Sequence, residues 1–358
     1  MSPGPSLFAD LIGQSQAVAL LLAGLERRRL APAYLFAGPE GVGRRLATLR
    51  FLEGVLAGPG GDPGVRRRLA EGNHPDVLWV EPTYQHQGEL VPASRALEQG
   101  VTRRTPPQLR LEQIRDVSRF LARRAVEAPG CLVVLDGAEA MAEAAANALL
   151  KTLEEPGEGR LVLITAAPER LLATIRSRCQ TIPFGRLNPG AMAEVLARCQ
   201  TLARGQATPR GQAMAGVSAA NAQVEPEAES QAPPFDPLAL VDPPALVELA
   251  AGSPGALLSH RQQWQSLPEG LAERLQQLGS AGLPLQRLEL AREICEGLDG
   301  DQQLWLVQWW QLVLWRTGAG AASLHRLNRL RSHLLAYVQP RLAWEVALLD
   351  LARGMDKG

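Results

Sequence analysis

The sequence lacks several features that mark common classes of protein. Its four cysteines lie far apart and form no CxxC pair, which argues against a zinc site and against a disulfide framework. It contains no apolar run of 18 residues, so we expect no membrane-spanning helix. The N-terminal stretch MSPGPSLFADLIGQ has no basic region followed by an apolar one and is not expected to be a signal peptide. These features predict a cytoplasmic protein with reduced, buried thiols.

The sequence also lacks a net charge and has almost no lysine. Its 37 basic and 37 acidic side chains balance, so we expect no general attraction to nucleic acid or to a membrane surface. Lys151 and Lys357 are the only lysines, and arginine makes up the rest of the basic side chains. A length of 358 residues and a hydrophobic content of 46% predict two or three domains with a sizeable core.

Apolar runs alternate with helical patterns as far as about residue 187. Strands are expected within 33–38, 74–82, 130–141, 160–169 and 174–184. Helices are expected at 14–29, from about 44, at 111–128 and at 142–156, and an exposed polar loop is expected at 83–108. Strands that are continuous apolar runs and alternate with helices predict a parallel sheet covered on both faces. Ligands of such sheets bind at the carboxyl ends of the strands.

Helical patterns replace strands after residue 187. Residues 203–237 have almost no large apolar side chains and are expected to be a flexible insertion. Helical patterns resume at 243–260 and continue to about 355, which predicts an all-helical C-terminal domain. Few cations stand among the tryptophans of 304–315, so packing in a core or a subunit interface is favoured over base stacking for Trp305, Trp309, Trp310 and Trp315.

The most informative segment is YLFAGPEGVGRRLATLRF, residues 34–51, which has the frame of a phosphate-binding loop. A short apolar strand leads into a glycine-rich turn and then a helix, and the glycine-rich turn contains Gly38, Pro39, Gly41 and Gly43. In a working loop a lysine follows the last glycine, and a serine or threonine after it binds Mg²⁺ through its hydroxyl. Here these two positions are Arg44 and Arg45, so the loop is predicted to be degenerate.

The arginine bias of the chain offers a simpler account of the first change. A lysine could be replaced by Arg44 without meaning, although the forked guanidinium does not fit the space of a compact ammonium. The bias does not explain why Arg45 stands where a hydroxyl is needed. Loss of ATP hydrolysis is therefore the favoured interpretation.

The acidic motif that would complete such a site is also altered. Asp136 ends an apolar strand at the position that holds Mg²⁺ in motor ATPases, but the next residue is Gly137 where a catalytic glutamate is needed. Glu139 lies two residues further on and would point at a different angle. An equally good hypothesis for Asp136 is that it caps a helix over 138–155.

Two arginines end the helical pattern before the last strand, within Ile175-Arg176-Ser177-Arg178-Cys179-Gln180. An arginine at the rim of a domain could reach the nucleotide of a neighbouring subunit, because its fixed fork suits the charge that develops on a transferring phosphoryl group. From spacing alone, a surface arginine with a local carboxylate partner is the more common case.

Three further features have modest interpretations. The segment 101–124 is locally basic and could contact DNA phosphates, or could be a solvated helix face, through Arg103, Arg104, Arg110, Arg115, Arg119, Arg123 and Arg124. His74 stands alone and is expected to cap a loop. Gly252-Ser253-Pro254-Gly255 signals a turn between two helices.

Taken together, these motifs resemble the delta-prime family of bacterial DNA polymerase III clamp-loader subunits, which are AAA+ proteins. The resemblance covers most of the chain and is strongest over IGQ (12–14), AYLFAGPEGVGR (33–44), NHPD (73–76), IRDV (114–117), AANALLKTLEEP (145–156) and APERLLATIRSRCQ (167–180). LLKTLEEP followed by Ser-Arg-Cys is specific to clamp-loader subunits, and the degenerate loop selects delta-prime from the active motors.

The resemblance implies a fold of three parts. An α/β AAA+ domain with a degenerate phosphate loop would occupy 1–187, a small helical lid 188–260 with the insertion 203–237, and a helical collar for oligomerisation 261–358. It further implies that Arg178, with Ser177 and Cys179, forms an arginine finger that acts on the ATP site of an adjacent motor subunit.

Some features depart from the family pattern. Many members carry a four-cysteine zinc module after the loop helix, but residues 51–75 contain no cysteine, so no metal is expected. The ATP-sensing arginine of motor subunits would fall near Gly255. No cofactor is predicted, and the altered loop makes ATP binding doubtful.

The implied function is that of a non-hydrolysing clamp-loader subunit of the DNA polymerase III holoenzyme. Its partners would be the motor (gamma/tau) and delta subunits in a hetero-pentameric ring, with the sliding clamp and primed DNA bound by the assembled complex. Two alternatives stay open: an active ATPase motor that uses Arg44 and Glu139, and a DNA-binding module that uses the basic segment 101–124.

Overall fold

The computed structural model describes residues 7–86, 88–96, 98–101, 106–155, 157–206, 243–279, 284–318, 320–336 and 338–355. The chain forms two compact units, and each is described here by itself. The first comprises Met1–Leu196 and Gly252–Gly255, and the second Ala197–Ala251 and Ala256–Gly358. The start of the expected insertion is wrong, because residues 203–206 belong to helix α7 (Pro189–Gln206). Residues 207–237 lie outside the described residues, and the three-part division at 187 and 260 stays a prediction.

A five-stranded sheet forms the centre of the first unit. Its strands are β1 (Ala33–Ala37), β2 (Val77–Val80), β5 (Leu132–Asp136), β6 (Arg160–Thr165) and β7 (Gln180–Pro183), in the order β2-β5-β6-β1-β7. Every neighbouring pair is parallel, so the carboxyl ends of all five strands lie along one edge. The parallel-sheet class predicted from the sequence is confirmed.

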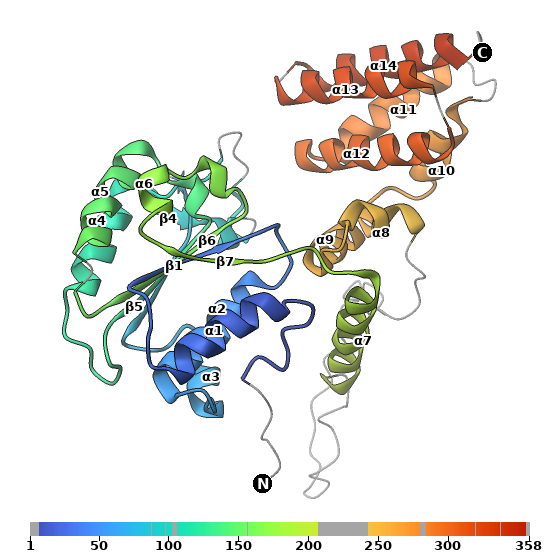
Figure 1. Cartoon of the computed structure of the whole chain (residues 1–358). Helices are drawn as coiled ribbons and strands as arrows, with labels where there is room; N and C mark the ends of the chain where they lie inside the picture. The colour runs from blue at the N-terminus through green and yellow to red at the C-terminus, as the bar shows by residue number, and fades with distance from the viewer. Residues whose placement is uncertain are drawn as a thin grey trace, which may run out of the picture. The chain divides into compact units, whose positions relative to one another are not determined.

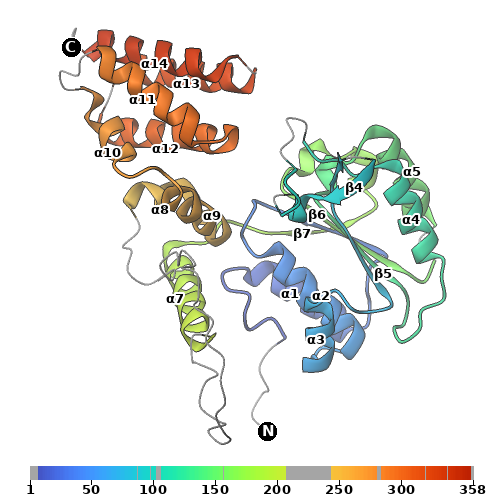
Figure 2. The same ribbon diagram turned by 180° about the vertical axis from the view of Figure 1, so that it is seen from behind.

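Helices cover both faces of this sheet, as Figures 1 and 2 show. One face carries α1 (Ser15–Glu26), α2 (Arg44–Ala57) and α3 (Pro63–Ala70), and the other carries α4 (Leu111–Leu121), α5 (Glu143–Glu154) and α6 (Ala173–Arg176). The strands β1, β5 and β6 contribute side chains with exposed fractions of a few per cent to a core shared with α4 and α5. Burial on both faces accounts for the continuous apolar runs of the strands.

The structure corrects three expectations for the segment between the loop helix and β5. Residues 83–108 are not an irregular loop, because β3 (Thr83–His86) and β4 (Glu89–Pro92) pair as an antiparallel hairpin. The helix expected over 111–128 ends at Leu121. The short helix α3 was not expected, although the Asp62 carboxylate caps it by accepting the Val65 N–H at 2.8 Å.

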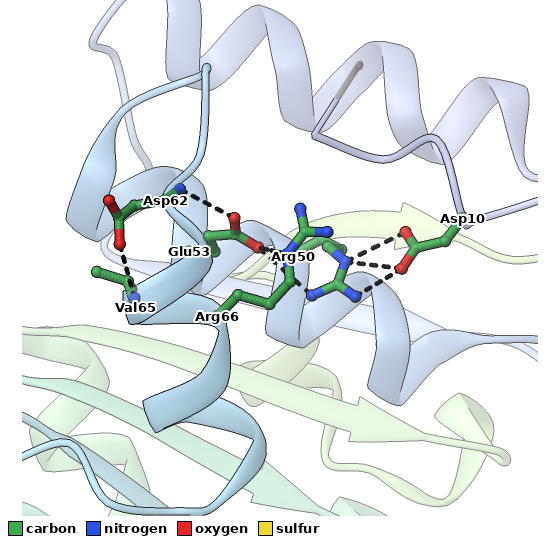
Figure 3. A network of polar contacts seen from close by, with 6 residues as sticks. All are labelled: Asp10, Arg50, Glu53, Asp62, Val65 and Arg66. Atoms are coloured by element: carbon green, nitrogen blue, oxygen red, sulfur yellow. Dashed lines mark hydrogen bonds and ion pairs between the residues drawn. The ribbon is translucent and has the colours of Figure 1, made fainter. Parts of the chain in front are cut away.

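A buried carboxylate joins α2 to the start of α3, as Figure 3 shows. Glu53 is 1% exposed; it accepts the Asp62 N–H at 3.1 Å and the Arg66 Nε–H at 2.8 Å. Arg50 lies 3.4 Å from Glu53 and also bonds the Asp10 carboxylate through Nε at 2.9 Å. These contacts link the N-terminal segment, α2 and α3 through charged groups, in addition to the buried Leu7 side chain that approaches Gly54 of α2.

The second unit is helical throughout its described residues. Its α-helices are α8 (Pro244–Ala250), α10 (Leu271–Gln276), α11 (Pro284–Gly297), α12 (Gly300–Arg316), α13 (Ala321–Leu335) and α14 (Pro340–Met355). Two helices are divided between the units, α7 (Pro189–Gln206) and α9 (Pro254–Gln265). Trp309 and Trp310 are 1% exposed, so core packing is confirmed for them, whereas Trp315 is 66% exposed. The indole N–H of Trp305 donates to His260 Nδ1 at 3.0 Å.

Candidate functional site

The degenerate phosphate loop lies where the sequence predicted it, between β1 and α2. Gly38 approaches the backbone of Phe184 so closely that a Cβ atom would lie 2.2 Å from the Phe184 carbonyl oxygen. Gly43 precedes α2 with a φ of 99°, a left-handed conformation that favours glycine. The backbone therefore keeps the frame of a phosphate loop, and what differs is the side chains at its end.

Arg45 pairs with Asp136 across the site. Its Nε lies 3.1 Å from the Asp136 carboxylate, and its guanidinium lies over the Trp79 ring at 5.1 Å from the centroid. Burial raises the pKa of Asp136 above its ordinary value, and the positive charges of Arg45 and Arg44 offset only part of this rise. A guanidinium thus contacts the carboxylate that stands, by sequence, at the magnesium-binding position of motor ATPases; a magnesium role for Asp136 itself stays a prediction.

Arg44 lies in a partly buried, acidic environment. Burial lowers the pKa of its guanidinium, and the negative charges of Glu139, Asp136 and Glu40 oppose that shift. Arg44 therefore has nearby carboxylates that partly compensate its charge.

Glu139 accepts a backbone hydrogen bond. Its Oε1 accepts the Ala166 N–H at 3.0 Å, directly after β6 ends. The carboxylate therefore bridges the ends of β5 and β6, and its use as a catalytic base stays untested. The alternative that Asp136 caps a helix is wrong, because α5 begins at Glu143 and its N-cap is Ala142.

Remote segments bind three consecutive carbonyl groups of the loop. The Ser253 hydroxyl donates to the Glu40 carbonyl at 2.6 Å, and the Gly255 N–H donates to the Gly41 carbonyl at 3.0 Å. The side-chain amide of Gln14 donates to the Val42 carbonyl at 3.1 Å. The turn at 252–255 and the IGQ motif are therefore parts that hold the loop.

Gly255, near which the resemblance places the ATP-sensing arginine of motor subunits, touches the loop backbone. A Cβ atom built on Gly255 would lie 2.6 Å from the Gly41 Cα atom. Backbone cannot yield as a flexible side chain can, so no larger residue fits here without displacing the loop. The packing therefore leaves no room for an arginine side chain at position 255 itself.

The Ser-Arg-Cys motif forms the turn between α6 and β7. The Ser177 hydroxyl and the Arg178 Nη1 both donate to the Thr174 carbonyl, each at 3.1 Å. Arg178 is exposed, and its Nη2 donates to Glu154 Oε1 at 2.8 Å, so it has the local carboxylate partner considered from the sequence. Burial raises the pKa of Cys179 to about 11, which keeps the thiol protonated and makes it a packing residue.

The NHPD motif has a structural role that the sequence did not reveal. The carboxylate of Asp76 accepts the N–H groups of Val126, Glu127 and Ala128 at 2.7–2.8 Å. His74 Nδ1 accepts the Asp76 N–H at 3.2 Å, which is the loop role expected for this histidine. The motif therefore holds the loop that follows α4.

The basic segment keeps both of its interpretations. Arg103 and Arg104 lie outside the described residues. The Arg119 guanidinium bonds Asp116 on the exposed face of α4, and the Arg123 guanidinium lies 5.3 Å from the centre of the Phe120 ring. DNA binding by this segment stays a prediction.

No group of three metal-ligating side chains occurs within the described ranges. The same part of the chain includes no helix long and apolar enough to cross a membrane.

Comparison with known proteins identifies the family. The model of the DNA polymerase III delta subunit family matches residues 13–188, and that of the cyanobacterial DNA polymerase III delta prime C-terminal domain matches residues 235–351. The chain belongs to the delta-prime family of DNA polymerase III subunits. The delta-prime subunit of Pseudomonas aeruginosa is 37% identical over 201 residues, and the match covers 53% of each chain.

Other relatives of this delta-prime chain have a similar extent of match. The delta-prime subunit of Bacillus subtilis is 33% identical over 51% of each chain. The tau subunit of Escherichia coli is 31% identical over 49% of this chain and 25% of its own length. The chain thus matches about half the length of the curated delta-prime relatives. A gamma subunit-related protein from Thermotoga maritima has a TM-score of 0.46 at 15% identity, covering 95% of this chain and 99% of its own, which is too distant to support an inference.

Proposed function

We propose that this delta-prime family member is a non-hydrolysing subunit of a clamp loader. The observation that carries the proposal is the ion pair between Arg45 and Asp136 at 3.1 Å. A guanidinium in contact with the Asp136 carboxylate competes with Mg²⁺ for it. Without Mg²⁺, the negative charge that develops on the phosphate oxygens of ATP during phosphoryl transfer is not neutralised. Gly137 supplies no base beside Asp136, and Gly255 supplies no arginine.

The partners we propose are the motor and delta subunits of the same complex, in a ring of five that acts on a sliding clamp and primed DNA. Relatives named as tau and gamma/tau subunits share sequence with this chain, which supports a common assembly. In that ring Arg178 would act as an arginine finger at the ATP site of a neighbouring motor. Its exposure at the rim of the first unit is compatible with this role.

Titration of the isolated chain with ATP tests the proposal that its nucleotide site does not hydrolyse ATP. We expect neither tight binding of Mg·ATP nor release of phosphate. Steady phosphate release would refute the proposal and favour the active-motor alternative, in which Arg44 and Glu139 serve as cation and base.

ATPase assays of the reconstituted complex test the finger. We expect Arg178→Ala to leave assembly intact and to lower DNA-stimulated turnover by about 10³-fold, since arginine fingers contribute factors of this order. Arg176→Ala is the matched control, because Arg176 is also exposed and lies two residues away. Equal turnover of the Arg178 and Arg176 variants would end the finger assignment.

A further inference from the structure

The tip of Arg178 is fixed from two sides. Its Nη1 donates to the Thr174 carbonyl of α6 at 3.1 Å, and its Nη2 donates to Glu154 Oε1 of α5 at 2.8 Å. Both side chains are partly exposed, with 36% of Arg178 and 54% of Glu154 accessible. The guanidinium is therefore held in one orientation while it stays open to solvent.

A long side chain used as a finger needs such support. Arginine has several rotatable bonds, and catalytic groups lose rate steeply when their position is not defined. The two bonds described here engage one N–H on each terminal nitrogen. Of the five N–H donors of a guanidinium, these bonds leave three for an incoming oxygen atom.

We propose that Glu154 is a positioning residue for the Arg178 finger. The inference rests on the proposed function, because it needs the finger to act on a neighbour's ATP. Glu154 is the last residue of α5, and Arg178 follows the end of α6. The pair thus sets the direction of the finger relative to two packed helices.

The opposite effect is also physically possible and serves as an outcome of the test. A carboxylate beside the guanidinium could retain it and compete with the phosphate oxygens. Loss of Glu154 would then raise the turnover of the neighbouring site. Positioning is favoured because the two hydrogen bonds act on different nitrogens of the Arg178 guanidinium. The Thr174 carbonyl orients Nη1, and the Glu154 carboxylate orients Nη2 and so fixes the plane of the group.

The experiment measures DNA-stimulated ATPase of the reconstituted complex with Glu154→Ala. We expect kcat to fall about two- to fivefold, the factor that corresponds to an exposed ion pair, with KM for ATP unchanged. Glu154→Gln keeps an acceptor oxygen and should lose less. Glu155→Ala, a change at the adjacent exposed glutamate, is the matched control and should leave kcat unchanged.

A double-mutant cycle separates positioning from a structural role. If Glu154 acts through Arg178, then Glu154→Ala should have no further effect in the Arg178→Ala background. Equal losses in both backgrounds would overturn the proposal, as would a rise in kcat or a result equal to that of Glu155→Ala. If Arg178→Ala itself leaves turnover unchanged, the finger assignment fails instead, so the two failures are distinguishable.

Discussion

The buried Glu53 carboxylate offers the sharpest test of what holds the first unit together (Figure 3). Glu53→Ala removes the acceptor of the Asp62 N–H and of the Arg66 Nε–H, and a longer contact to Arg50 at 3.4 Å. Hydrogen bonds to charged groups each contribute about 1.5–3 kcal/mol. Arg66 is 42% exposed and regains water, and Arg50 keeps Asp10, so both losses are partly offset.

The expected cost is therefore near the lower end of the range for breaking a buried pair, about 3 kcal/mol. For a unit of roughly 200 residues this lowers Tm by about 6–12 °C. Calorimetry of the full chain measures the shift, and hydrogen exchange of the α3 amides should report local opening.

Two variants control this prediction. Glu53→Gln keeps the acceptor for the Asp62 N–H and should cost less, about 2 kcal/mol. Glu71→Ala removes an exposed carboxylate 4.0 Å from Arg67 and should cost at most about 0.5 kcal/mol. If Glu53→Ala is no more destabilising than Glu71→Ala, the charged network does not stabilise the fold.

Three further predictions follow from other contacts. Burial raises the pKa of Asp76, but the three backbone N–H bonds lower it below its ordinary value. The stabilisation is thus present above the unfolded pKa of about 3.9 and is lost as pH falls through the folded pKa. Urea unfolding should find Asp76→Asn less stable by about 2–3 kcal/mol at pH 7, with the gap narrowing below pH ~4; a constant gap would contradict the assignment. Gly255→Arg should lower Tm without creating ATP binding, because its Cβ would lie 2.6 Å from Gly41 Cα; tight ATP binding by this variant would show that the packing can yield. Finally, EDTA treatment should leave Tm unchanged, and elemental analysis should find no stoichiometric zinc.

The sequence predicted the parallel sheet and the loop frame because both rest on local pattern. The apolar runs of β1, β5 and β6 are continuous since both sheet faces are covered, and the glycines of 38–43 are required by the backbone itself. The helix α3 could also have been predicted from the sequence, since Asp62 followed by Pro63 is a helix-start signal.

The remaining features depend on contacts between distant residues. The helical spacing of α4 extends past Leu121, but the Asp76 carboxylate draws residues 126–128 into a loop. The hairpin of β3 and β4 consists of four-residue strands, too short for alternation to be recognised.

At the candidate site, the sequence shows that Arg45 lacks a hydroxyl but not where its side chain goes. Its pairing with Asp136, and that of Arg178 with Glu154, join residues 91 and 24 positions apart. No local sequence pattern predicts that either pair of side chains meets.

The cation opposite Asp136 is the guanidinium of Arg45, which is a side chain of the protein and not a bound ion. Its presence therefore cannot vary with the cell's supply of free magnesium or with the ratio of adenine nucleotides. In the proposed ring, this subunit would keep one state while the neighbouring motor subunits bind and release ATP.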